Sequence, residues 1–154
     1  MVRRILAILG LLVVAVTFSP VLRAAADADS QSVRTESGRM RCYVNAKDVG
    51  HGGGSLVVCS TYGPDSTGFP QAPVSGTAGF HYNLAEVTDT GAFNWEIGNI
   101  PGSPEAQAKD ITLNYGQTYH INGWTILPNV DGTLFTNDGT GHGMFVSIEN
   151  VYSF

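Results

Sequence analysis

The chain has 154 residues, with 13 acidic and 8 basic side chains and a formal net charge of −5. An acidic chain without a basic stripe does not suit nucleic acid or anionic lipid, so both classes of partner are excluded. The length fits one domain that follows an N-terminal segment.

Residues 1–28 have the pattern of a cleaved secretory signal peptide. Two arginines precede an almost unbroken apolar run from Ile5 to Phe18, and small residues offer cleavage after Ala26 or Ala28. The run is about 14 residues long, whereas a permanent span needs roughly 20, so an uncleaved anchor is the weaker alternative. We therefore expect export to the cell envelope or the extracellular medium, with no stable membrane span in the mature chain. Removal of the segment takes away three arginines and one aspartate, which lowers the formal charge to −7.

Residues 29–38 are polar apart from one valine, which predicts a flexible lead-in. From residue 39 to 154 short runs of alternating apolar residues follow one another, separated by turn residues. This pattern predicts a single all-β domain, an antiparallel β-sandwich, with a small closed β-barrel as the alternative. The residues expected in its core are Tyr43, Val57, Phe80, Tyr82, Phe93, Trp95, Ile111, Leu113, Trp124, Ile126, Phe135, Phe145 and Ile148.

The sequence contains one candidate helix and one long loop. Ser103 supplies an N-cap, Pro104 fits the first helical position and Glu105 an early acid, so we expect one or two turns there. Residues 63–79 contain three prolines and predict an ordered surface loop.

Cys42 and Cys59 are the two cysteines of the chain. An even pair in an exported protein predicts a disulfide, worth roughly 3 kcal/mol in the chain-entropy model. Two thiolates this far apart, with no Cys-x-x-Cys or paired histidine nearby, make a poor zinc site. We therefore predict a Cys42–Cys59 bridge, no metal site and no cofactor.

The stretch Gly50-His51-Gly52-Gly53-Gly54-Ser55 is similar to the HGGG oxyanion-hole motif of lipases and esterases. That motif works with a Gly-x-Ser-x-Gly nucleophile elbow in a large α/β domain, and the chain has no such elbow. Three glycines also allow positive φ values at little steric cost. We interpret the stretch as a turn between the two cysteine-containing strands.

A second glycine cluster, residues 137–143, predicts a hairpin loop. It lacks the lysine and helix of a phosphate loop and the carboxylates of a calcium loop. Its glycines nevertheless leave the backbone open to a ligand, and Asp138 and His142 add a carboxylate and an imidazole. If a ligand site exists, we expect it here. Trp124 is expected to pack in the core, and would join a ligand platform if its side chain faced outward.

Several segments together resemble small exported proteins of mycobacteria and related actinobacteria. They are the leader that ends in Ala-Asp-Ala, the glycine-containing loop between the cysteines, and the stretch from Tyr115 to Met144. The resemblance implies export and carries over no catalytic residue.

Every motif in the chain therefore reduces to a turn or a strand, which favours a non-enzymatic binding module for an unknown envelope or extracellular ligand. The alternatives are a small secreted hydrolase with a site built from loops, and a structural envelope protein without a small ligand. A cleft that holds a carboxylate beside a histidine would indicate the hydrolase, and a flat face with exposed aromatic residues would indicate the binding module.

Overall fold

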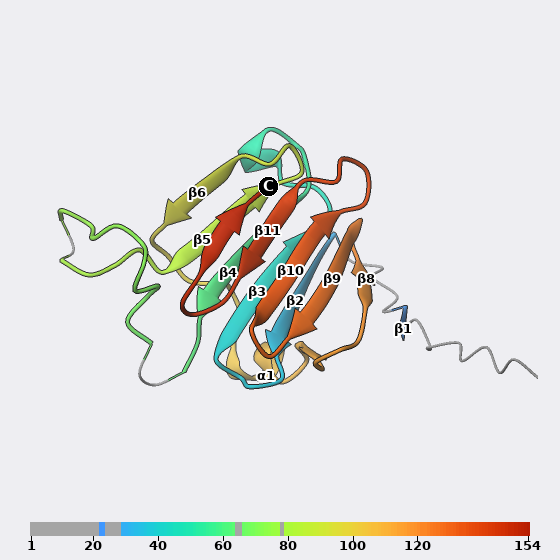
Figure 1. Cartoon of the computed structure of the whole chain (residues 1–154), viewed down its shortest axis with the longest axis horizontal. Coiled ribbons are helices and arrows are strands. Elements are labelled where there is room, and N and C mark those ends of the chain that lie inside the picture. Colours follow the sequence, from blue (N-terminus) through green and yellow to red (C-terminus); the bar gives the residue numbers. More distant parts are fainter. Residues whose placement is uncertain (1–21, 24–28, 64–65, 78) are drawn as a thin grey trace, which may run out of the picture.

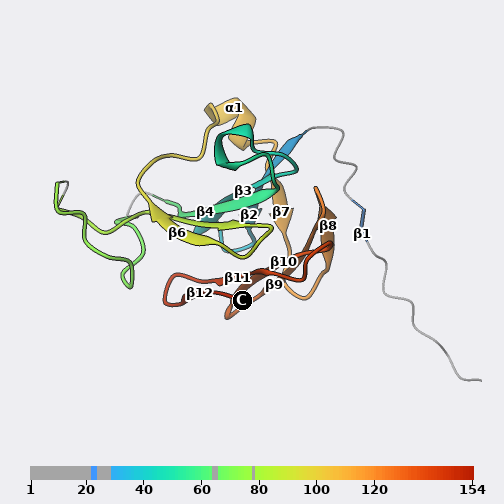
Figure 2. The same ribbon diagram turned by 90° about the horizontal axis from the view of Figure 1, so that it is seen from above.

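The computed structural model describes residues 22–23, 29–63, 66–77 and 79–154. These residues form two six-stranded sheets stacked as a sandwich (Figures 1 and 2) and no closed barrel. The prediction of a mostly β domain is confirmed, and the barrel alternative is wrong. Most of the predicted signal peptide lies outside the described residues, and no described helix is long and apolar enough to cross a bilayer.

Sheet A contains the C-terminal strands, in the order β1-β8-β9-β10-β11-β12. Their bounds are β1 Leu22–Arg23, β8 Tyr119–Ile121, β9 Trp124–Asn129, β10 Gly132–Asn137, β11 Gly143–Val146 and β12 Val151–Ser153. All neighbours are antiparallel except β1 and β8. The β8–β9 hairpin turns at Asn122 and Gly123, both at positive φ, as the Asn-Gly pair favours.

Sheet B has the order β6-β5-β4-β3-β2-β7. Its strands are β2 Ser30–Thr35, β3 Met40–Asn45, β4 Leu56–Thr61, β5 Leu84–Thr88, β6 Phe93–Glu96 and β7 Ile111–Leu113. A single 3₁₀ turn, η1 (Val49–His51), and positive-φ glycines at 52 and 53 join β3 to β4, so the glycine-rich stretch is a turn. Because β2 and β7 run parallel, the sandwich is mostly rather than wholly antiparallel.

The core lies between the two sheets. Val57, Leu113, Trp124, Ile126 and Phe135 are buried there, as predicted. The predicted residues Tyr82, Phe93, Trp95, Ile111 and Ile148 are partly buried and pack against this cluster. Apolar side chains in the core that the prediction did not include are Val33, Met40, Val44, Phe69, Ala72, Ala85, Val87, Tyr119, Ile121, Met144 and Val146.

Three predicted core residues lie elsewhere. Cys42 and Val44 face the core, so Tyr43 between them is on the outer face of sheet B. Phe145 alternates in the same way with buried Met144 and Val146, and it stacks on Tyr152 at a ring-centroid distance of 5.2 Å. Phe80 precedes β5 in the long loop and is 47 % exposed. The core predictions for these three residues are wrong.

The segment 29–38, predicted to be a flexible lead-in, contains an interior strand. β2 pairs with β3 on one side and β7 on the other, and Val33 is fully buried. The strand has no apolar pattern in the sequence, since Val33 is its one apolar residue. It is stabilised by pairing with strands β3 and β7, which the local sequence does not reveal. The predicted disulfide is confirmed: Cys42 and Cys59 are directly opposite each other on β3 and β4, and both are buried in the core.

A connection from residue 97 to residue 110, which we call the strap, crosses the outer face of sheet B. Figure 2 shows its helix α1 (Pro104–Gln107) on the side of sheet B that faces away from sheet A. Ser103 caps this single turn and Pro104 begins it, which confirms the helix prediction. The strap is held by Arg41, whose guanidinium forms a buried two-point ion pair with Asp110, at 2.6 and 3.0 Å. Arg41 also donates to the carbonyl oxygens of Ile100 and Pro101.

Candidate functional site

The sandwich has two ends that differ in how their loops are joined. At the closed end, uppermost in Figure 1, the β3–β4, β5–β6, β8–β9 and β10–β11 turns meet. At the open end the β2–β3, β9–β10 and β11–β12 turns meet the start of the strap. The predicted site loop, residues 137–143, belongs to the closed end.

The side chain of Asn137 holds this loop together through hydrogen bonds. Its Oδ1 accepts from the backbone N–H groups of Gly139 and Thr140, at 3.0 and 3.1 Å, and lies 3.3 Å from the Thr140 hydroxyl oxygen. Its Nδ2 donates to the Ser55 hydroxyl, and Thr140 in turn donates to the backbone oxygen of Asp89. The loop amides that were expected to receive a ligand are therefore engaged by the protein itself.

Asp138 and His142 have different partners. The Thr125 hydroxyl donates to Asp138 at 2.5 Å and lies 3.0 Å from Nδ1 of His120, while the Asp138 carboxylate is 4.0 Å from the same nitrogen. Since the hydroxyl proton is directed at the carboxylate, His120 has to donate to this oxygen and does not activate it as a nucleophile. Both side chains are more than two-fifths exposed, so the cluster lies on an open surface and not in a cleft.

His142 is exposed, and its Nδ1 lies 3.1 Å from the backbone oxygen of Phe154. Trp124 is fully buried, so it packs in the core and does not form an outward platform. The loop thus places Asp138 and His142 near the surface without joining them in one cavity. Ligand binding by either residue stays a prediction.

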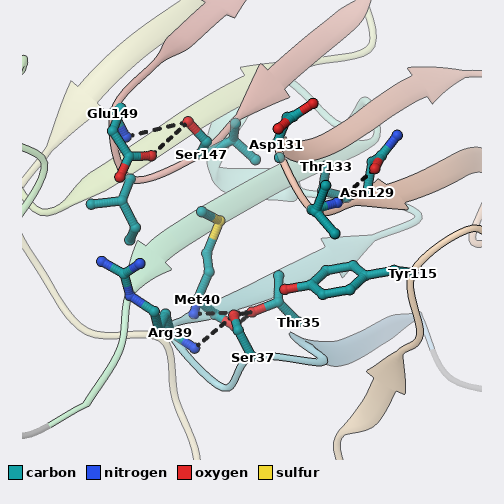
Figure 3. Close-up of a pocket in the computed structure, with 14 residues that line it drawn as sticks. Thr35, Ser37, Arg39, Met40, Tyr115, Asn129, Asp131, Thr133, Ser147 and Glu149 are labelled. Carbon is teal, nitrogen blue, oxygen red and sulfur yellow. Dashed lines mark hydrogen bonds between the residues drawn. The ribbon is translucent and has the colours of Figure 1, made fainter.

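The open end contains a pocket between the two sheets, which we call the end pocket (Figure 3). It has a volume of about 110 Å³ and is lined from residues 35–40, Tyr115, 129–133 and 146–149. Its inner surface includes Met40, Val146 and Thr133, which are at most 4 % exposed. The Thr133 hydroxyl is buried without a hydrogen-bond partner among the described residues.

Polar side chains surround this inner surface. Figure 3 shows the ring of Tyr115 reaching across the pocket with its hydroxyl towards Thr35. Thr35 is tied to the start of β3 by bonds with the backbone of Met40 and contacts the Ser37 hydroxyl at 3.2 Å. Hydroxyl groups therefore surround the largely apolar inner surface, and the charged residues Arg39, Asp131 and Glu149 are exposed at the rim.

The end pocket continues into a larger polar groove along the strand ends of sheet B at the open end. A hollow of about 450 Å³ shares Ser37, Arg39 and Ile148 with the end pocket. It also shares residues 61–63 and Ser66 with a hollow of about 730 Å³ that extends to the strap. We call these two hollows together the groove.

Tyr62 stands in the middle of the groove, where its ring is 44 % exposed. Its hydroxyl donates to Oε1 of Gln107 at 2.6 Å, which joins the end of β4 to helix α1. The remaining polar lining of the groove is hydroxyl and amide groups, namely Ser37, Ser60, Thr61, Ser66, Thr67, Asn83, Asn99 and Gln107. The described lining of the groove has no acidic residue, and its charged side chains are Arg39 and the ion-paired Arg41.

These residues carry no signature in the sequence. Tyr62 and the glycines after it resemble any strand end, and the Thr133 side chain follows an ordinary Asp-Gly turn. A weak signal is the length of the two connections, 62–83 and 97–110, because long connections in a compact domain are often functional. Within the described residues no group of three potential metal ligands comes together. Comparisons with family models, with curated proteins and with solved structures return no match.

Proposed function

We propose that the protein is an exported binding module, not an enzyme, whose ligand is an uncharged, hydroxyl-rich chain, an oligosaccharide, held along the groove. The observation that carries this proposal is the groove itself, with its hydroxyl and amide lining around the exposed Tyr62 ring. Sugar hydroxyls need paired donors and acceptors, and the apolar face of a sugar packs on an aromatic ring.

The charge of the protein supports the same class of ligand. An acidic chain repels anionic polymers, and Arg41, which could attract an anion, is already neutralised by Asp110. A cationic ligand would need carboxylates in the groove, where the described lining has none. Arg39, the other cation of the described lining, is exposed at the rim and keeps its hydration, so an uncharged ligand can lie along the groove without burying a charge.

Two carboxylates, Asp131 and Glu149, raise the alternative of a glycosidase at the end pocket. Both side chains are exposed. The general acid of a glycosidase needs a raised pKa, which burial in an apolar site provides. Their exposure therefore favours binding over hydrolysis. Export is supported by the signal-like leader and by the Cys42–Cys59 disulfide, which suits an oxidising compartment.

The test is binding to a panel of soluble neutral polysaccharides, namely glucan, mannan, galactan, arabinan and xylan, followed by titration calorimetry. Tyr62→Ala should weaken binding roughly tenfold, the equivalent of about 1.4 kcal/mol, because it removes the ring and its hydroxyl. The matched control is Tyr152→Ala, an exposed tyrosine on the outer face of sheet A that should leave affinity unchanged.

Two results would contradict the proposal. Retention of none of the polysaccharides would remove the ligand class, and equal losses from both tyrosine substitutions would remove the groove as the site. Release of new reducing ends during incubation with a bound polysaccharide would show a hydrolase instead.

A further inference from the structure

Without a bound ligand, the Thr133 hydroxyl destabilises the folded protein. The residue is 1 % exposed, and its oxygen has no partner among the described residues. A buried hydroxyl without a hydrogen bond destabilises a protein, whereas valine has nearly the same shape and no such group. A threonine at this place therefore calls for a partner that the described part of the chain does not provide.

The end pocket offers room for such a partner. Its volume of about 110 Å³ is that of roughly four water molecules, and it is smaller than the cavity of about 150 Å³ that admits benzene. It therefore holds only a few heavy atoms of a ligand. Met40 and Val146 close it on the side of the core, and Ser37, Arg39 and Ile148 connect it with the groove.

We infer that the end pocket receives the terminal hydroxyl-bearing group of the oligosaccharide, and that Thr133 Oγ1 is the buried hydrogen-bonding group that recognises it. This inference rests on the proposed function and adds to it which part of the oligosaccharide the protein binds. Met40 and Val146 close the end pocket on the side of the core, so a chain that lies along the groove can place its end there, and the module would bind chain ends at this point. Thr35, Ser37 and Tyr115 supply the hydroxyls around the same end group.

The experiment uses Thr133→Val in the full mature chain, with Thr133→Ser as the variant that keeps the hydroxyl. The ligands are short neutral oligosaccharides from the polysaccharide that binds best, each with its terminal unit unmodified or capped by a bulky ether. The wild-type protein should prefer the uncapped chain about tenfold. Thr133→Val should lose roughly fivefold in affinity for that chain and most of the preference, as expected when one hydrogen bond is lost. Thr133→Ser should stay within about twofold of the wild type.

Thermal unfolding separates recognition from damage to the fold. Thr133→Val should unfold at the same or a higher temperature than the wild type, because it removes an unsatisfied group, and yet bind less well. Equal binding of capped and uncapped chains, with Thr133→Val unaffected and Tyr62→Ala impaired, would overturn the end-pocket inference and leave the groove intact. Failure of every oligosaccharide to bind would overturn the proposed function, and this inference with it.

Discussion

One strand, β10, connects the closed and the open end, and its inward-facing side chains show how the two differ. Asn137 at the closed end is 7 % exposed, and its side chain contacts Gly139 and Thr140 of its own loop and the Ser55 hydroxyl of a neighbouring one. Thr133, four residues earlier at the open end, is 1 % exposed, and its hydroxyl has no partner among the described residues. The bonded Asn137 side chain stabilises the fold at the closed end, although Trp124 Nε1 in the core beside it also has no partner among the described residues. At the open end the Thr133 hydroxyl lies beside a pocket, where we propose that a ligand supplies its partner. Substitutions at the closed end should therefore change stability, and those at the open end should change binding.

At the strap the two effects should coincide. The strap forms a wall of the groove, and a buried ion pair fixes it to sheet B, so its loss should lower both stability and binding. Asp110→Ala would leave the Arg41 guanidinium buried without its counter-charge. Breaking a buried pair from one side destabilises a protein by about 3–5 kcal/mol. We expect a loss of this size in urea unfolding with the disulfide intact, together with loss of ligand binding.

The matched variant removes both charges. Arg41→Met with Asp110→Leu replaces the pair by apolar side chains of similar length, and such replacements are often close to neutral. The double substitution should therefore recover most of the stability lost in Asp110→Ala. If the double substitution lowered the free energy of unfolding by the sum of the two single losses, the pair would not be coupled, and other contacts would hold the strap.

Asn137→Ala examines the closed end. It removes the acceptor of two backbone N–H groups and the donor to Ser55, so we expect a loss of about 2 kcal/mol in the free energy of unfolding, with polysaccharide affinity unchanged. Asn137→Asp keeps the acceptor of the two N–H groups and adds a negative charge, and the Ser55 hydroxyl can donate to its second oxygen, so its loss should be smaller than that of Asn137→Ala. A clear fall in affinity from Asn137→Ala with little loss of stability would reverse the roles of the two ends.

The closed end was also where the sequence pointed, for a physical reason. An Asn-Gly turn, a Ser-Pro helix start and an even cysteine pair each predicted their element correctly, and alternating apolar residues found most of the strands, although Phe80 lies in a loop. Glycines beside Asp138 and His142 are a local signal too. They indicate an accessible backbone. They do not reveal that the Asn137 side chain already binds the backbone N–H groups of this loop, or that the Thr140 hydroxyl already binds a neighbouring loop.

The groove and the end pocket cannot be predicted from such signals, because the topology of the sheets brings their parts together. Tyr62, Gln107 and Thr133 come from a strand end, a one-turn helix and the opposite sheet. β2 escaped prediction for the same reason, since a polar segment with one valine becomes a strand only between β3 and β7. The wrong core assignment of Tyr43 has a simpler cause: a shift of one residue exchanges the two faces of a strand.

The smallest expected effect lies at helix α1, on the strap that walls the groove. A hydrogen bond from the Ser103 hydroxyl lowers the pKa of Glu105, and a backbone hydrogen bond adds to the shift. The lowered pKa means that the ionised carboxylate stabilises the folded state above its unfolded-state pKa, and that this contribution fades as the pH falls through the lowered value. Ser103→Ala should raise the pKa of Glu105 towards its ordinary value in an NMR titration, and should destabilise the fold by about 1 kcal/mol through loss of the N-cap. Ser103→Thr, which keeps the hydroxyl, should preserve both the pKa and the stability. An unchanged Glu105 pKa in Ser103→Ala would show that the Ser103 hydroxyl does not bind this carboxylate, and that its role in the cap is limited to the Ala106 N–H.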